Sequence, residues 1–201
     1  MRFILLIFAL ATVPFMAWAV EAPAGQVRID ATKVLRGHFV EEHSMKGSRG
    51  PMRSSGHFVV APAHGLIWGI EKPFPTSTII TPNGAAQDIG GMAVKLPAKN
   101  IAHLYDIVGG ALAGDWRGLE EDFVLTRSGD AQHWQILLTP RQGNASRLPY
   151  ATITVDGSRF VENIVMTKVD ESYDSLSFSD EILSPTPLTS AENAVFNKVM
   201  P

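Results

Sequence analysis

Short strand-like runs separated by turn-forming residues fill most of this 201-residue chain, and they constrain its fold more than any other feature. Alternating and β-branched residues with Gly, Pro, Asn or Asp between them are typical of antiparallel strands joined by hairpins. One such turn is Pro82-Asn83-Gly84, because Asn and Gly both tolerate positive φ. A meander of this kind has an apolar face to bury, so the sheet must curl or be covered. The pattern predicts strands at residues 35–43, 57–60, 65–70, 77–81, 85–89, 122–127, 133–139, 151–155, 160–168 and 175–179.

Two segments have helical rather than strand spacing. Residues 98–108 carry apolar side chains at helical intervals, and the pattern continues weakly to residue 112. Gly109-Gly110 interrupts it and marks either a bending point or the end of the helix. Thr189 and Glu192 have the spacing of a capping box, which predicts a short C-terminal helix. The expected fold class is therefore mainly β with helices (α+β), a curved antiparallel sheet with a helix across its mouth. Such a fold leaves a cavity if the helix does not fill the concave face.

The N-terminus has the pattern of a cleavable signal peptide. Arg2 supplies a positive charge, residues 3–15 are mostly apolar, and Ala17-Trp18-Ala19 is an A-x-A cleavage signal. The alternative is a membrane anchor, but the apolar run is too short to span a bilayer comfortably. We expect residues 1–19 to be the signal peptide and residues 20–201 to form a single exported domain in the periplasm.

Composition limits the function classes further. The chain has no Cys, so disulfides play no part in its stability and no cysteine is available for lipid attachment. A formal net charge of −3 argues against a general nucleic-acid binder. No stretch after residue 20 is long and apolar enough to cross a bilayer, so we do not expect a membrane-spanning protein.

No catalytic or metal-binding motif is present in the sequence. It contains no G-x-S-x-G, no H-E-x-x-H and no Gly-rich phosphate loop. His38 and Glu42 would share one face of a strand, but His43 points to the other, which is a poor arrangement for a metal. A Ser/His/Asp triad has no sequence signature, because its members meet only in the fold. We therefore expect a protein that is not an enzyme, with no metal and no cofactor.

The apolar side chains of the strands allow two interpretations that periodicity alone does not separate. They form either a packed core or the wall of a lipid cavity, since both place them on one buried face. The loop with Lys46, Arg49 and Arg53 is likewise either solvated or a contact for anionic head groups or an acidic partner. The candidate wall residues are Phe39, Phe58, Val60, Trp68, Ile70, Phe74, Ile79, Trp134, Ile136 and Leu138, and the candidate lid residues are Ile101, Leu104, Val108 and Leu112.

The order of these motifs resembles the LolA family of periplasmic outer-membrane lipoprotein carriers, most closely its divergent LolA-related group. The likeness runs in order over most of the chain after residue 20. It includes a leading strand with Gly and Phe, an S-S-G-x-F motif, a P…L-x-W…P hairpin and a later hairpin ending in L-x-P. The residues that carry it are 35–41, Ser54-Ser55-Gly56-His57-Phe58, Ala61-Pro62, Leu66-Ile67-Trp68, Lys72-Pro73-Phe74, Pro82-Asn83-Gly84 and 122–140.

The resemblance implies a fold and a role. The fold is an incomplete, curved antiparallel barrel with a helical lid, whose cavity takes up acyl chains of a lipoprotein or glycolipid. An inner-membrane exporter would load this carrier and an outer-membrane acceptor would unload it, and we expect it to be a monomer. Where the well-known carriers have an Arg that helps to hold the lid closed, this chain has Ala61, so closure here would depend on apolar contact. The alternatives are a sensor or adaptor of the same fold that reports on envelope lipids through a protein partner, and an exported hydrolase.

Overall fold

One antiparallel sheet forms most of the molecule. The computed structural model describes residues 25–97, 107–144, 148–185 and 187–199. The sheet strands are β1 (Lys33–Ser44), β2 (Met52–Ala61), β3 (Gly65–Lys72), β4 (Thr76–Thr81), β5 (Gly84–Ile89), β6 (Met92–Leu96), β7 (Phe123–Gly129), β8 (Trp134–Pro140), β9 (Tyr150–Gly157), β10 (Val161–Lys168) and β11 (Tyr173–Pro185).

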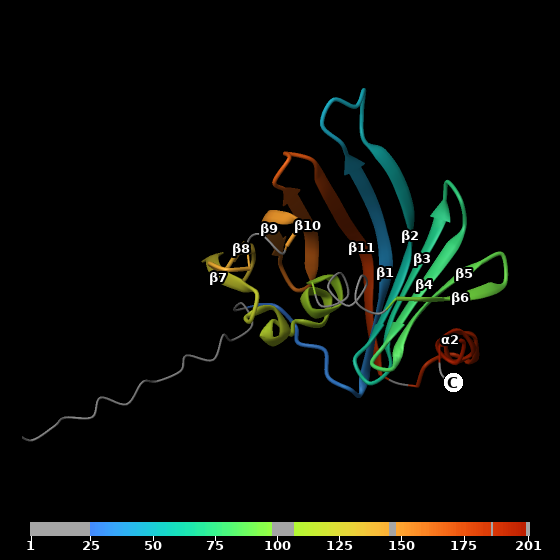
Figure 1. The fold of residues 1–201 in the computed structure, drawn as a ribbon. Helices are drawn as coiled ribbons and strands as arrows, with labels where there is room; N and C mark the ends of the chain where they lie inside the picture. Colours follow the sequence, from blue (N-terminus) through green and yellow to red (C-terminus); the bar gives the residue numbers. More distant parts are fainter. Residues whose placement is uncertain (1–24, 98–106, 145–147, 186, 200–201) are drawn as a thin grey trace, which may run out of the picture.

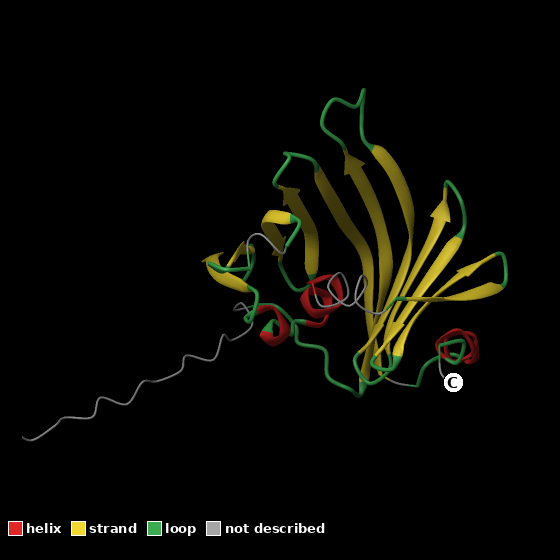
Figure 2. Cartoon of the chain, viewed as in Figure 1, coloured by secondary structure: helices red, strands yellow, loops and turns green. Residues whose placement is uncertain are grey.

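The sheet is open, with strand order β6-β5-β4-β3-β2-β1-β11-β10-β9-β8-β7. Most neighbours in the sheet are also neighbours in the chain. The exception is the pairing of β1 with β11, which brings the first and last strands together in the middle. β6 and β7 stand at the two edges, and the sheet between them curves so that its edges lie apart (Figures 1 and 2). The predicted fold class, a curved and incomplete antiparallel barrel with helices, is confirmed.

The strand predictions were wrong at four places. β2 begins at Met52, well before the predicted strand 57–60. β6 was not predicted, although Gly90-Gly91 is a hairpin turn signal and Met92, Val94 and Leu96 alternate with Ala93 and Lys95. This strand is short, and its side chains are almost all exposed. β11 continues to Pro185, well beyond the predicted strand 175–179. The turn expected at Asp156-Gly157 comes after these residues, since both belong to β9.

The described helical residues lie at two separate places. A helix covers 107–113 and is followed by the 3₁₀ turn η1 (Arg117–Leu119), while α2 (Ser190–Phe196) is the C-terminal helix. The capping box predicted from Thr189 and Glu192 is confirmed. Within the parts of the chain placed by the structure, no helix is long and apolar enough to cross a membrane.

The helix at 107–113 passes through Gly109-Gly110 without ending there. It ends instead at Gly114, whose φ is +68°, with Gly114 N–H donating to Ala111 and Asp115 N–H donating to Gly110 at 2.8 Å. These two bonds form a Schellman cap, which needs a left-handed residue at the position of Gly114. The expected interruption at the glycine pair was therefore wrong for the described residues.

Two apolar clusters lie on opposite faces of the sheet. The larger one occupies the concave face and includes the helix at 107–113. The smaller one lies on the convex face of β1–β5, where α2 covers it. This arrangement explains why both alternate sets of residues in β3 are apolar, because Leu66 belongs to the concave cluster and Ile67 to the convex one.

Candidate functional site

A cavity of about 330 Å³ lies between the concave face of the sheet and the helix at 107–113. This volume is at the lower end of the range for ligand pockets in proteins. Seven of its ten lining residues are large and apolar, which is the composition expected for a site that binds an acyl chain. The lining residues are Glu41, Leu66, Trp68, Thr78, Ile80, Gln87, Leu96, Val108, Met166 and Leu176.

Strand register brings most of these side chains together in rows. One row crosses β3 to β6 through the paired positions Leu66, Ile80, Ala85 and Leu96. Side chains at paired positions point to the same face of a sheet, so this row forms a continuous apolar surface. The next row starts at Trp68 and continues through Thr78 and Gln87, which introduces polar groups into the wall.

Aromatic rings surround Trp68. Its ring stacks on Phe39 with 3.7 Å between centroids, and it meets Phe178 edge-to-face at 6.2 Å. Phe58 lies between them, 5.5 Å from Phe178 in a T-shaped contact. Gly37 permits this packing, because a Cβ at that position would come within 2.7 Å of the Phe58 ring. Trp68 is half-buried by these contacts and also lines the cavity.

Most of the predicted wall residues lie on the concave side. Phe39, Phe58, Val60, Trp134, Ile136 and Leu138 are buried in the concave cluster, and Trp68 and Ile70 pack against it. Of these residues, Trp68 lines the cavity itself. Whether any of them contacts a lipid stays a prediction.

Two predicted wall residues lie elsewhere. Phe74 was expected on the wall but is 78% exposed in the loop between β3 and β4. Ile79 is fully buried, but in the convex cluster beneath α2. Its neighbour Ile80 faces the cavity instead, because successive side chains of a strand point to opposite faces.

The predicted lid is only partly within the described residues. Val108 lines the cavity and Leu112 is buried in the concave cluster, whereas Ile101 and Leu104 lie outside the described residues. The N-terminal segment holds the helix in place, since Gln26 Nε2 donates to the Ala111 carbonyl at 2.9 Å. Trp116 Nε1 donates to Gln26 Oε1 at 3.0 Å and completes this buried network. Through Val108, the helix at 107–113 contributes to the cavity wall, and whether it moves as a lid stays a prediction.

Several cavity residues were not identified from the sequence. Met166 and Leu176 come from β10 and β11, far along the chain from Leu66 and Ile80. Their strands were predicted, but the pairing of β11 with β1 that brings them to the cavity has no local sequence signal. Leu66 belongs to the L-I-W motif, which supports the family resemblance, but it was not predicted as a wall residue.

Glu41 is the one charged side chain in the lining. It lies on β1 opposite Ser54, whose Oγ donates to Glu41 Oε2 at 3.1 Å. Burial raises the pKa of the Glu41 carboxyl, and the nearby negative charge of Asp174 raises it further, against the hydrogen bond from Ser54. The polar wall is completed by Thr78 and Gln87, which are paired across β4 and β5.

A polar cluster continues from Glu41 toward the loop end of the sheet. Asp174 on β11 accepts from His43 Nδ1 and forms an ion pair with Lys168 at 3.0 Å. The candidate metal ligands His38 and His43 contact different acidic residues. His38 Nδ1 lies 3.6 Å from Asp180, whereas His43 Nδ1 contacts Asp174. Among the residues that the structure describes, no group of three His, Cys, Asp or Glu side chains could hold a metal ion.

Two of the predicted basic residues pair with acidic neighbours at the surface, and one of them, Arg53, lies in β2 and not in the predicted loop. Lys46 Nζ lies 2.9 Å from Glu171, and Arg53 Nε lies 3.9 Å from Glu42. Arg49 is exposed in the same loop. A role for these residues in partner or head-group contact stays a prediction.

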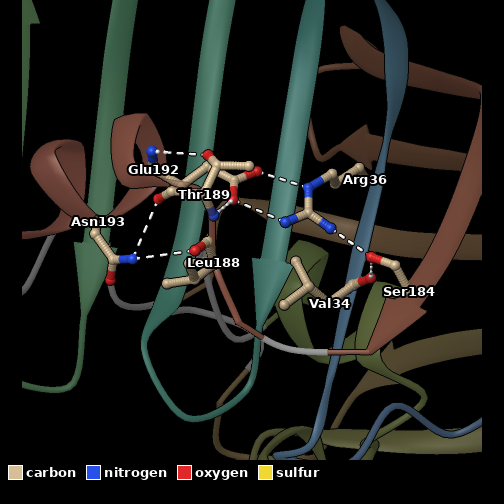
Figure 3. A network of polar contacts seen from close by, with 7 residues as sticks. All are labelled: Val34, Arg36, Ser184, Leu188, Thr189, Glu192 and Asn193. Carbon is tan, nitrogen blue, oxygen red and sulfur yellow. Dashed lines mark hydrogen bonds and ion pairs between the residues drawn. The ribbon is translucent and has the colours of Figure 1, made fainter.

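The convex face is closed by a bidentate ion pair between β1 and α2 (Figure 3). Arg36 Nε and Nη2 donate to the Glu192 carboxylate at 2.6 and 2.7 Å, and Arg36 Nη1 donates to Ser184 Oγ at 2.5 Å. The hydrogen bonds from Arg36 lower the pKa of Glu192 to about 2, with a further contribution from the Thr189 backbone N–H. Ala61 is buried in the same cluster, so an Arg at that position would have to place its charge beneath α2.

A family model described as "Outer membrane lipoprotein carrier protein LolA-like" matches residues 17–158. The chain belongs to this LolA-like family. A search of curated proteins gives no significant sequence match to this LolA-like chain.

Several solved structures resemble the LolA-like chain at low sequence identity. A LolA superfamily protein from Nitrosomonas europaea is 10% identical, with 89% of this chain and 98% of that chain covered and a TM-score of 0.48. MucB in the MucA/MucB complex of Pseudomonas aeruginosa is matched at 14% identity and a TM-score of 0.48, over 80% of this chain and 55% of that chain. The lipoprotein LppX of Mycobacterium tuberculosis is 8% identical, with 79% and 89% covered and a TM-score of 0.38.

Proposed function

We propose that this LolA-like protein is a periplasmic carrier that hides an acyl chain of a lipoprotein or lipid in its concave cavity and passes it from the inner to the outer membrane. The observation that carries the proposal is the cavity of about 330 Å³ with seven large apolar lining residues, on the open side of a LolA-like sheet. Each buried CH₂ group contributes about 0.8 kcal/mol, so an apolar cavity can offset the loss of a chain from a bilayer without covalent chemistry.

The position of Trp68 makes uptake measurable. Its ring lines the cavity, whereas Trp116 and Trp134 are buried and are not among the lining residues. Adding a long-chain amphiphile to the mature protein should therefore change the Trp68 emission. In Trp68→Phe the spectral change should be lost, although calorimetry should still detect binding. Unchanged emission together with no heat of binding would contradict the carrier function.

Transfer is tested separately from binding. The protein purified from a bacterial periplasm should carry acyl species that native mass spectrometry detects. It should also move a labelled acyl lipid from donor to acceptor vesicles faster than spontaneous exchange. A protein without bound lipid that co-purifies with one tight protein partner would favour the sensor or adaptor instead.

A further inference from the structure

Glu41 is an unusual component of a cavity for acyl chains. A carboxylate in apolar surroundings is costly unless it is paired and hydrogen-bonded. Its one hydrogen-bond partner among the described side chains is the Ser54 hydroxyl, which reaches only Oε2. No Lys, Arg or His nitrogen in the described residues lies within ion-pair distance of this carboxylate.

Two described basic groups at this end of the cavity are already engaged by Asp174. His43 lies on the same strand, but its Nδ1 contacts Asp174. Lys168 is held by the other oxygen of Asp174 at 3.0 Å. Asp174 and His43 act on the Glu41 carboxyl in opposite directions, so the hydrogen-bond geometry, and not the surrounding charge, leaves the second carboxylate oxygen of Glu41 available as an acceptor.

Two further residues add polar groups to the cavity wall but no positive charge. Thr78 and Gln87 lie side by side on β4 and β5 and line the cavity with Glu41. Their hydroxyl and amide groups can both donate and accept hydrogen bonds. None of the ten described lining residues is a Lys, Arg or His, so the described part of the wall offers no counter-ion for a phosphate or carboxylate.

We propose that the cavity selects acyl ligands whose polar end donates hydrogen bonds, such as an ammonium, amide N–H or hydroxyl group, with the free oxygen of Glu41 as the acceptor, and that it rejects anionic head groups. This inference rests on the proposed carrier function and specifies the chemical class of its cargo. It excludes free fatty acids and lysophosphatidic acids as cargo and keeps uncharged or cationic acyl amphiphiles. Like charges brought together at a binding site cost several kcal/mol, which is the basis of the discrimination.

Three probes with the same alkyl chain test this selection: dodecylamine, monolaurin and laurate, each below its micelle concentration at pH 8. Calorimetry should show that dodecylamine and monolaurin bind at least about tenfold more tightly than laurate, which corresponds to about 1.4 kcal/mol. Glu41→Gln should bring the affinity for laurate close to that for monolaurin and weaken the binding of dodecylamine.

Glu42→Gln is the matched control. Glu42 is the next residue on β1, so it points to the opposite face, where it faces Arg53 at 3.9 Å. This variant should leave the order of the three probes unchanged, and circular dichroism should confirm that both variants are folded.

The possible outcomes separate the two proposals. If laurate binds the unchanged protein as tightly as monolaurin, or if Glu41→Gln behaves like Glu42→Gln, the inference about Glu41 is overturned and the carrier function stands. If none of the three probes binds, the carrier function fails and the selection by Glu41 fails with it.

Discussion

The two faces of the sheet are both apolar in β1–β5, but they are covered in different ways. On the convex face, α2 and the ion pair of Arg36 with Glu192 close a small cluster. On the concave face, a cavity remains between the sheet and the described helix at 107–113, which contributes Val108 to the lining. Apolar alternation therefore specifies which side chains are buried, while the covering element decides whether they form a packed core or the wall of a cavity.

Two adjacent residues of β4 give the strongest test of this difference between the two faces. Ile79→Ala should lower the free energy of unfolding by about 3 kcal/mol, because the side chain is fully buried beneath α2. Ile80→Ala should lower it less, because Ile80 borders existing empty space, and it should weaken amphiphile binding instead. Urea unfolding and calorimetry on both variants measure the two effects. Equal loss of binding in the two variants would contradict the separation of the faces.

The ion pair of the convex face gives the next largest effect. Glu192→Gln should reduce the free energy of unfolding at pH 7 by about 2 to 3 kcal/mol, because Arg36 would lose its partially buried counter-ion. The folded-state pKa of Glu192 is about 2, below the ordinary value of 4.5. The stabilisation is therefore present above pH 4.5 and is lost as the pH falls toward 2.

Thermal unfolding between pH 7 and pH 2 should show the melting temperatures of the wild type and Glu192→Gln converging near pH 2. Glu171→Gln is the control, since Glu171 also forms an ion pair but is largely exposed. It should change stability by no more than about 0.5 kcal/mol at any pH. A constant difference between wild type and Glu192→Gln down to pH 2 would show that the carboxylate charge is not the cause.

The carboxyl of Glu41 on the concave face should affect stability in the opposite direction to Glu192 as the pH changes, and by a smaller amount. Burial raises the pKa of Glu41, and Asp174 and His43 are the charged neighbours that modify it in opposite directions. Ionisation of Glu41 therefore costs stability as the pH rises through its raised pKa, whereas below pH 4.5 the group is protonated in both states. Glu41→Gln should raise the melting temperature at pH 8, and this gain should vanish in acid. A gain that persists at pH 4 would point to packing rather than charge.

The sequence predicted local features well and contacts between distant strands poorly. Turns such as Pro82-Asn83-Gly84 and the capping box at Thr189 depend on a few consecutive residues, so their chemistry is readable in the sequence. Ile79 and Ile80 show the limit, because both are buried and alternation cannot tell which one faces the cavity. That choice depends on α2, which follows β4 by more than a hundred residues.

The candidate site was predictable as a region but not as a set of residues. The family resemblance placed an acyl cavity on the concave face, and Trp68 and Val108 do line a cavity there. Glu41 was part of a strand motif, but its position against an apolar pocket follows from β1 pairing with β2 and β11. The exposure of Phe74 could not be read from composition, because an aromatic residue in a loop is as apolar as one in a core.

The sheet has free edges at β6 and β7, so its curvature is less constrained than that of a closed barrel. A closed barrel can widen only if a row of backbone hydrogen bonds between two strands is broken, because its strand number, tilt and register are linked. In the open sheet, no such row joins β6 to β7, so a change in curvature does not have to break one. For the proposed carrier function, this means that the curvature of the sheet, and not a fixed circumference, would set the width of the acyl ligand that the cavity accepts.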